Sequence, residues 1–242
     1  MVGLGTIINV AAIIAGGLLG RLFGHGIKRR WRDALGITCG VSTMFLGAAG
    51  AIAGMLSVAE NGTLVSGKSM LLVLSLVLGT FIGEVLNIDN WFTRFGEWLK
   101  VKTKNTRDLG FVNGFVTASL TVSIGAMAIV GSIQDGIFGD WSVLATKAIL
   151  DLIIVLVMTC SLGRGCVFSA IPVGVFQGTM TALARLVAPI MTDLAMTNLS
   201  VVGSVLIFCV GLNLIRAEQL RVANMLPSLI LAVAAAFLPF SL

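Results

Sequence analysis

A lysine and an aspartate lie four residues apart within an apolar stretch, TKAILDLIIVLVM, where charged side chains are rare. This spacing places Lys147 and Asp151 on one face of a helix, at the usual separation of a helical ion pair. At the centre of a membrane helix each charge costs roughly 2.5 to 3.5 kcal/mol on insertion scales, and such residues mark pathways for ions or substrates. We interpret Asp151 as a proton or cation site, Lys147 as its charge partner or a carboxylate-binding group, and Thr146 as an auxiliary ligand. The alternative is a structural salt bridge that locks this helix against its neighbours.

The next apolar stretch, VFSAIPVGVFQGTMTALARL, combines polar side chains with residues that disturb helices. Pro172 removes one backbone donor and frees a carbonyl one turn earlier, while Gly174 and Gly178 permit local unwinding. Free backbone groups at membrane depth occur only where they line protein or a wet cavity, so we expect a broken helix with Gln177 near the midplane. The alternative is a simple proline kink with Gln177 bonded to another helix. The predicted substrate- or ion-binding residues are Lys147, Asp151, Gln177, Asn9, Thr146 and Ser169, and the predicted helix-break residues are Pro172, Gly174 and Gly178.

The elements that must position these residues are membrane helices. Of the 242 residues, 57% are hydrophobic and only 11% are charged, and the mean hydropathy is +1.03. Soluble domains carry about a quarter charged residues, so this composition excludes a water-soluble globule. We expect one all-α transmembrane domain over residues 1–242, a polytopic bundle of about eight helices. The predicted helices cover about 4–24, 34–57, 69–88, 110–133, 142–163, 167–190, 197–215 and 222–241.

Basic residues fall in every second connection, which accounts for the net charge of +5 without any role for nucleic acid. By the positive-inside rule these connections face the cytoplasm, both termini lie outside, and connections with Asp135 and Asp140 face outward. We therefore expect a multi-pass protein of a bacterial inner membrane. The basic residues are Arg21, Lys28, Arg29, Arg30 and Arg32; Arg94, Lys100, Lys102, Lys104 and Arg107; Arg164; and Arg216 and Arg221.

The connection at about 89–108 has aromatic and aliphatic residues at helical spacing among charged ones. We expect an amphipathic cytoplasmic helix whose Lys102 and Lys104 lie near anionic lipid headgroups, each contributing roughly 1 kcal/mol. A solvated loop is the alternative. The apolar members are Trp91, Phe95, Trp98 and Leu99.

Glycine is abundant, with 29 residues lying mostly inside the predicted helices. Small residues let membrane helices approach closely, and glycine-rich faces on the first four helices also predict a homo-oligomer. Gly47 in the second helix matches Gly211 in the seventh, which favours an inverted repeat of helices 1–3 and 6–8, an arrangement common in transporters. The competing interpretation makes helices 1–2 and 3–4 parallel duplicates, because GGLLG and GTFIG each precede a basic connection and another glycine-rich helix.

Several chemistries lack their usual motifs. The sequence contains no GxSxG, HExxH or Walker pattern, so we expect no enzyme. Its four cysteines form no CxxC pair and it has a single histidine, so we expect no metal and no cofactor.

The motifs TKAILD and SLGRGCVFSAIPVGVFQG, with the opening GTIINVAAIIAGGLLG and the closing GLNLIRAEQLRVANMLPSL, span nearly the whole chain. In them the chain resembles the bacterial membrane-protein family called domain of unknown function 554, the YqgA/YdfK-like proteins. The resemblance implies a transporter and leaves the solute open. Phe176 stands before the QG pair, so no Tyr hydroxyl chemistry is implied there. The matching residues are Asn9, Lys147, Asp151, Gly163, Gly165, Ser169, Ala170, Gln177 and Gly178.

We therefore expect a carrier or channel for a small polar or charged solute, proton- or cation-coupled through the Lys147–Asp151 pair. The alternative is a non-transporting scaffold or assembly protein in which the pair is structural. A third interpretation, a lipid-handling protein, requires lipid in a lateral opening beside the 167–190 helix.

Overall fold

The apolar segments form helices, as the composition predicts. The computed structural model describes residues 2–24, 28–58, 62–124, 126–215 and 220–238. Six helices in this part of the chain are long and apolar enough to cross a membrane, or up to seven if one bent pair is a single span. A shorter apolar helix covers Val222–Ala235, so the segments correspond in order to the eight predicted spans, and the all-α transmembrane fold is confirmed. Arg216 and residues 239–241 of the predicted last helix lie outside the described residues.

The long helices are separated by short turns, a hairpin and 3-10 segments. The strands β1 (Leu56–Val58) and β2 (Leu64–Ser66) pair antiparallel, with Ser57 opposite Val65. The α-helices are α1 (Leu4–Gly24), α2 (Arg29–Met55), α3 (Ser69–Leu86), α4 (Ile88–Lys102), α5 (Phe111–Ser123), α6 (Ala126–Phe138), α7 (Ser142–Leu162), α8 (Ala170–Ala182), α9 (Ala184–Val187), α10 (Asp193–Asn213) and α11 (Pro227–Ala235). The 3-10 helices are η1 (Arg164–Ser169), η2 (Ala188–Ile190) and η3 (Val222–Met225).

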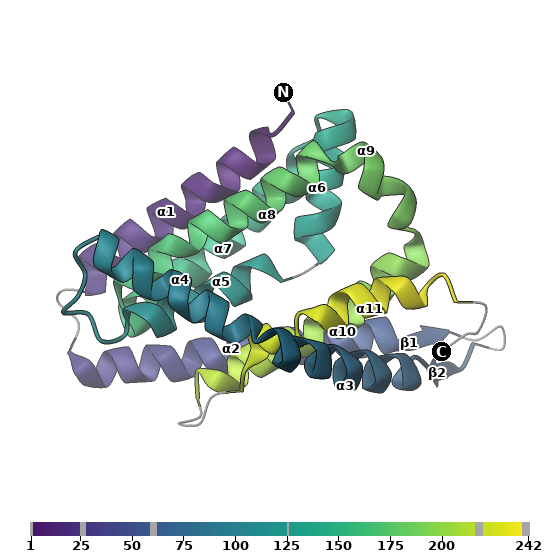
Figure 1. Cartoon of the computed structure of the whole chain (residues 1–242), viewed down its shortest axis with the longest axis horizontal. Helices are drawn as coiled ribbons and strands as arrows, with labels where there is room; N and C mark the ends of the chain where they lie inside the picture. The colour runs from purple at the N-terminus through teal and green to yellow at the C-terminus, as the bar shows by residue number, and fades with distance from the viewer. Residues whose placement is uncertain (1, 25–27, 59–61, 125, 216–219, 239–242) are drawn as a thin grey trace.

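Figure 1 shows two groups of helices, with α1, α6, α7 and α8 in one and α2, α3, α10 and α11 in the other. Glycines set the closest approaches inside each group. A Cβ at Gly16 of α1 would collide with the carbonyl oxygen of Leu152 in α7, and one at Gly47 of α2 would collide with the backbone of Phe208 in α10. Backbone contact of this kind supplies the van der Waals packing that holds helices together in lipid.

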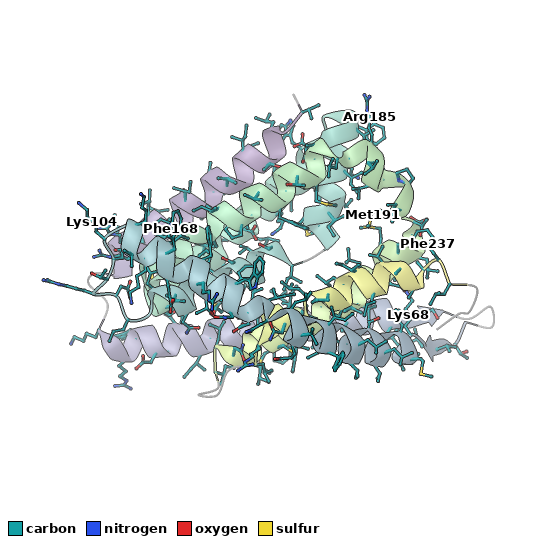
Figure 2. All side chains as sticks on the ribbon, viewed as in Figure 1. Lys68, Lys104, Phe168, Arg185, Met191 and Phe237 are labelled. Atoms are coloured by element: carbon teal, nitrogen blue, oxygen red, sulfur yellow. The ribbon has the colours of Figure 1, made fainter. Side chains whose placement is uncertain are left out.

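The basic connections gather at one end of the bundle. Figure 2 shows Lys104 at that end, while Lys68, Arg185 and Phe237 lie at the other. Helix α1 begins and helix α11 ends at the end opposite Lys104 (Figure 1). By the positive-inside rule the Lys104 end is expected to face the cytoplasm and the described ends of the chain to lie outside, and this orientation stays a prediction.

The predicted break in the 167–190 helix is wrong in its position. Helix α8 runs without interruption through Pro172, Gly174 and Gly178. Pro172 lies in the first turn, where a backbone N–H has no helical partner to lose. Gly174 faces the side chain of Val10, so it serves packing. The helix ends instead at Leu183, before α9.

The break occurs in the segment predicted as one helix over 110–133. Helix α5 ends at Ser123, Ile124 is extended, and the axes of Phe111–Ser123 and Met127–Phe138 meet at 62°. The second half continues to Phe138, which places Asp135 inside α6. The assignment of Asp135 to an outward-facing connection is therefore wrong.

The 89–108 connection contains helix α4, as predicted. Leu99 is buried against Phe111 and Phe115, while Trp91 and Trp98 are 73% and 55% exposed. Phe95 stacks on Trp98 with ring centroids 5.7 Å apart. Contact of this exposed aromatic face with lipid stays a prediction.

Gly47 and Gly211, matched in the sequence, lie in one interface between α2 and α10. Gly17 of α1 packs on Val167 of η1, and Gly83 of α3 packs on Asn224 of η3. Both the inverted repeat and the parallel duplication stay predictions.

Candidate functional site

The Lys147–Asp151 pair is formed and buried. The Nζ atom of Lys147 lies 2.6 Å from Oδ2 and 2.8 Å from Oδ1 of Asp151. The two residues are 7% and 3% exposed. Both oxygens of the carboxylate therefore face one ammonium in an environment of low dielectric constant, where removal of either partner leaves a costly unpaired charge.

The ammonium of Lys147 has a further partner on another helix. It donates to the carbonyl oxygen of Val122 at 2.8 Å. Val122 lies in the last turn of α5, whose final carbonyls have no partner within the helix and carry the negative end of its dipole. The break at Ile124 is what frees this carbonyl. Lys147 thus joins the carboxylate of Asp151 to the end of a half-helix, a geometry seen where broken membrane helices form ion sites.

Asn9 approaches the pair from α1, which runs beside α7. Its amide interacts with the carboxylate of Asp151. The residue is fully buried, and neither atom of its amide makes a hydrogen bond of standard geometry within the described chain. An amide at this place offers both a donor and an acceptor beside the ion pair.

Gln177 of α8 lies at the same level as Asn9. Helices α1 and α8 run antiparallel (Figure 1), with the Thr6 and Thr181 hydroxyl oxygens 3.5 Å apart and Gly174 against Val10. One turn inward from the threonine contact are Asn9 on α1 and Gln177 on α8. Gln177 is fully buried and both atoms of its amide also have no partner in the described chain.

Ser132 adds a third polar side chain from α6. Gly136, one turn further along, packs on Thr181 and Ala184, so Ser132 falls near the level of Gln177. Its hydroxyl is buried and unpartnered among the described residues. Leaving a buried polar atom unpaired costs about 1 to 3 kcal/mol, and nearly all such atoms in proteins bind protein, water or ligand. Asn9, Ser132 and Gln177 are therefore three buried side chains at about the same level whose polar atoms make no standard hydrogen bond within the described chain.

Two predicted residues lie elsewhere. Thr146 is exposed, and its hydroxyl donates to the carbonyl of Ser142 at 3.1 Å. One residue of helix rotates about 100°, so the neighbour of an inward lysine faces outward. Ser169 is buried in η1 and donates to the Cys166 carbonyl at 2.7 Å. Neither residue contributes a described contact to the ion pair.

The pair is closed from both directions in this structure. Toward the Lys104 end of the bundle the core contains the buried side chains of Ile13, Val155 and Met158. On the outer side the Asp135 carboxylate, fully buried in α6, accepts hydrogen bonds from the backbone N–H groups of Gly3 at 3.2 Å and Gly5 at 3.0 Å. This carboxylate therefore satisfies N–H groups at the start of α1 that have no helical partner.

Sequence reasoning missed the Val122 carbonyl, Ser132 and Asp135. All three depend on the break between α5 and α6. The only local signal is the SIG sequence at 123–125 within an apolar run. Because many glycines of this chain lie inside intact helices, one more glycine did not predict a break.

Comparison with known proteins identifies relatives that match this chain along nearly their whole length. A family model described as "Protein of unknown function (DUF554)" matches residues 4–237. The uncharacterised membrane protein YdfK of Bacillus subtilis (strain 168) is 29% identical over 228 residues, which are 94% of this chain and 93% of the relative. The uncharacterised protein YqgA of Escherichia coli (strain K12) is 28% identical over 234 residues, 95% of this chain and 94% of the relative. No solved structure matches the chain.

Proposed function

The chain belongs to the DUF554 family of membrane proteins, and we propose that it is a transporter, a carrier or channel for a small polar or charged solute in a bacterial inner membrane. One observation carries the proposal. A buried lysine–aspartate pair lies at the end of a broken membrane helix, beside buried amide and hydroxyl groups without protein partners in the described chain. Buried polar atoms without partners are costly, so we take those beside the ion pair as positions that a bound solute or water would satisfy.

Asp151 is the proposed coupling group. When the carboxylate takes a proton from water, the charge attraction to Lys147 is lost, and the ammonium keeps the Val122 carbonyl as its described partner. That change alters the force between α7 and the end of α5. The bend between α5 and α6 is then the place where helices can move relative to each other. A cation that replaces the ammonium at Asp151 would act on the same contact.

The buried amides of Asn9 and Gln177 are the proposed solute contacts. Each amide can donate and accept, so together they suit a solute with hydroxyl, amide or carboxylate groups. A bound solute, or water in its absence, would satisfy the atoms that lack protein partners.

The decisive experiment compares Asp151→Asn with wild type in proteoliposomes. Asparagine keeps the shape of the side chain and cannot titrate, so proton- or cation-linked flux, followed with a pH-sensitive dye inside the vesicles, should fall to background. The matched control is Asp140→Asn, at an exposed aspartate two residues before the start of α7, which should keep its flux. Equal flux in Asp151→Asn and wild type would remove Asp151 from the mechanism.

A second candidate function is a non-transporting scaffold or assembly protein. The enclosure of the pair, 7% and 3% exposed, favours it. In that case Asp151→Asn lowers the melting temperature in detergent, and no solute movement above empty vesicles is measured for the wild type with any solute tested. Flux by the wild type that depends on Asp151 rejects the scaffold.

A third candidate, lipid handling, is favoured by an apolar cavity of about 500 Å³ beside α8. Pro172, Phe176 and Met180 of α8 line it together with Ser123 at the end of α5. Native mass spectrometry tests it directly: retained lipid that is lost in Phe176→Ser supports the candidate, and identical lipid content in both proteins opposes it.

An exposed apolar face of α3 also supports a homo-oligomer. Helix α3 exposes a row of large apolar side chains at helical spacing, Val73, Val77, Phe81 and Val85. Such a row faces lipid or a second copy. The mass of the protein in native detergent tests this oligomer. A mass equal to that of one protomer would contradict it.

A further inference from the structure

A cavity of about 660 Å³ lies at the cytoplasmic end of the bundle, apart from the ion pair. Three separate segments line it: the end of α1, the connection at 104–108, and the turn from α7 into η1. Its floor is made of small residues, Gly20, Gly24, Thr159 and Gly163. Two turns of α7 separate Thr159 from Asp151, so the cavity does not belong to the site already described.

Four residues with cationic side chains are among those that line this cavity, namely Arg21, Lys104, Arg107 and Arg164. In the described part of the chain, the two ion pairs join Lys147 to Asp151 and Arg221 to Glu84. None of the four lining cations is therefore matched by a described carboxylate. Ordinary cytoplasmic loops are basic too, but they spread their charges over an open surface, whereas here the charges border one concave space.

The one acidic residue that lines the cavity, Asp108, is engaged elsewhere. Its Oδ1 accepts from the N–H of Gly110 at 3.1 Å, and its Oδ2 accepts from the N–H of Arg164 at 3.3 Å. The carboxylate thereby holds the connection onto the start of η1. The excess of positive charge in the cavity remains, because four cations border it against one carboxylate.

We propose that this cavity is a binding site for a phosphate-bearing anion, with Arg21, Lys104, Arg107 and Arg164 as its ligands. Guanidinium groups match phosphate oxygens with two parallel hydrogen bonds, and a lysine adds a compact charge. Two sources share this chemistry, the headgroup of an anionic phospholipid and a soluble phosphate compound from the cytoplasm. The site is independent of transport, since an anion bound here need not cross the membrane.

The test uses full-length delipidated protein in detergent. Inorganic phosphate and pyrophosphate are titrated by calorimetry, and phosphatidylglycerol is compared with phosphatidylcholine by native mass spectrometry. The variants are Lys104→Gln, Arg107→Gln and Arg164→Gln. The matched control is Lys102→Gln, a lysine on the same side of the protein that is exposed and does not line the cavity. Melting curves without ligand identify any variant that fails to fold, and Arg107, an exposed residue, is the safest of the three.

Each variant should weaken binding about tenfold, the usual effect of losing one charge-assisted hydrogen bond, while Lys102→Gln binds like wild type. Binding should also weaken as ionic strength rises. Phosphate or pyrophosphate binding with this pattern supports the site with a soluble anion. Selective phosphatidylglycerol binding with this pattern, without phosphate binding, supports it with a lipid headgroup. Absence of both, or equal binding by wild type and the three variants, overturns the proposal.

Discussion

The ammonium of Lys147 lies 2.8 Å from the carbonyl oxygen of Val122, which is 25 residues earlier in the chain. This contact connects an intact membrane helix to the end of a broken one. It gives the buried ammonium of Lys147 two partners, the carboxylate of Asp151 and a carbonyl at the end of α5. Because Lys147 contacts both groups, a change in the charge of Asp151 alters the contacts of Lys147 next to the bend between α5 and α6.

Removing one member of the buried pair should be worse than removing both. Lys147→Met leaves an unpaired buried carboxylate and should destabilise the protein by about 3 to 5 kcal/mol. The double variant Lys147→Met with Asp151→Leu leaves no buried charge and should recover most of that loss. Chemical unfolding in mixed micelles measures the difference. A double variant no more stable than Lys147→Met would show that the pair is not energetically coupled.

Two glycines of helix interiors should respond oppositely to alanine. Gly178 has open space where a Cβ would stand, and α8 is continuous there, so Gly178→Ala should be neutral or stabilising by about 0.5 to 1 kcal/mol. At Gly16 the added methyl meets the Leu152 carbonyl, and Gly16→Ala should cost about 1 to 3 kcal/mol.

Melting temperatures of the two alanine variants provide the check. Both variants replace a helical glycine with alanine, so they differ mainly in the atoms that surround the new Cβ. Destabilisation by Gly178→Ala equal to that of Gly16→Ala would contradict both the continuity of α8 and the backbone contact of α1 with α7.

Asp140 should stabilise the start of α7 in a pH-dependent way. Its Oδ1 accepts from the N–H of Ser142 at 2.9 Å, and this bond, followed by one from the Ser142 side chain, lowers the pKa of the carboxyl below its usual value. The ionised form is therefore favoured by folding. The stabilisation is complete above the unfolded pKa and is lost as the pH falls through the folded one.

Asp140→Ala should thus melt slightly below wild type near neutral pH, and the two melting temperatures should converge in acid. Differential scanning fluorimetry across the acidic range measures the gap. A gap that stays constant down to the lowest pH would mean that the charge on Asp140 is irrelevant to α7.

The aromatic face of α4 should lie at the lipid boundary. Trp91 and Trp98 are largely exposed in the bundle, and an indole prefers the interface between headgroups and acyl chains. Single-tryptophan proteins, with the other indoles replaced by Phe, report their depth by fluorescence quenching. Lipids brominated near the headgroup should quench both residues. Quenching by aqueous iodide with none by brominated lipid would place α4 in water.

Particular residues show how far sequence reasoning reached. The apolar lengths predicted the spans because lipid requires every backbone group to be bonded within its own segment, a local condition. The spacing of Lys147 and Asp151 predicted their contact for the same reason, since helix geometry alone brings them together. Pro172 was misjudged because the cost of a proline depends on its distance from the start of the helix, and that start was placed three residues too early.

By itself, then, the sequence determined a bundle of membrane helices and a charged pair on α7, and it predicted the orientation of the bundle. Only the tertiary structure decided that α5 breaks, that Val122 presents its carbonyl to Lys147, and that Asn9 and Gln177 come level on facing helices. The physical reason is the distance along the chain over which the interactions act. Helix formation and charge pairing act over a single turn, whereas the partners of an orphaned carbonyl or a buried amide come from helices distant in the chain, and packing selects them.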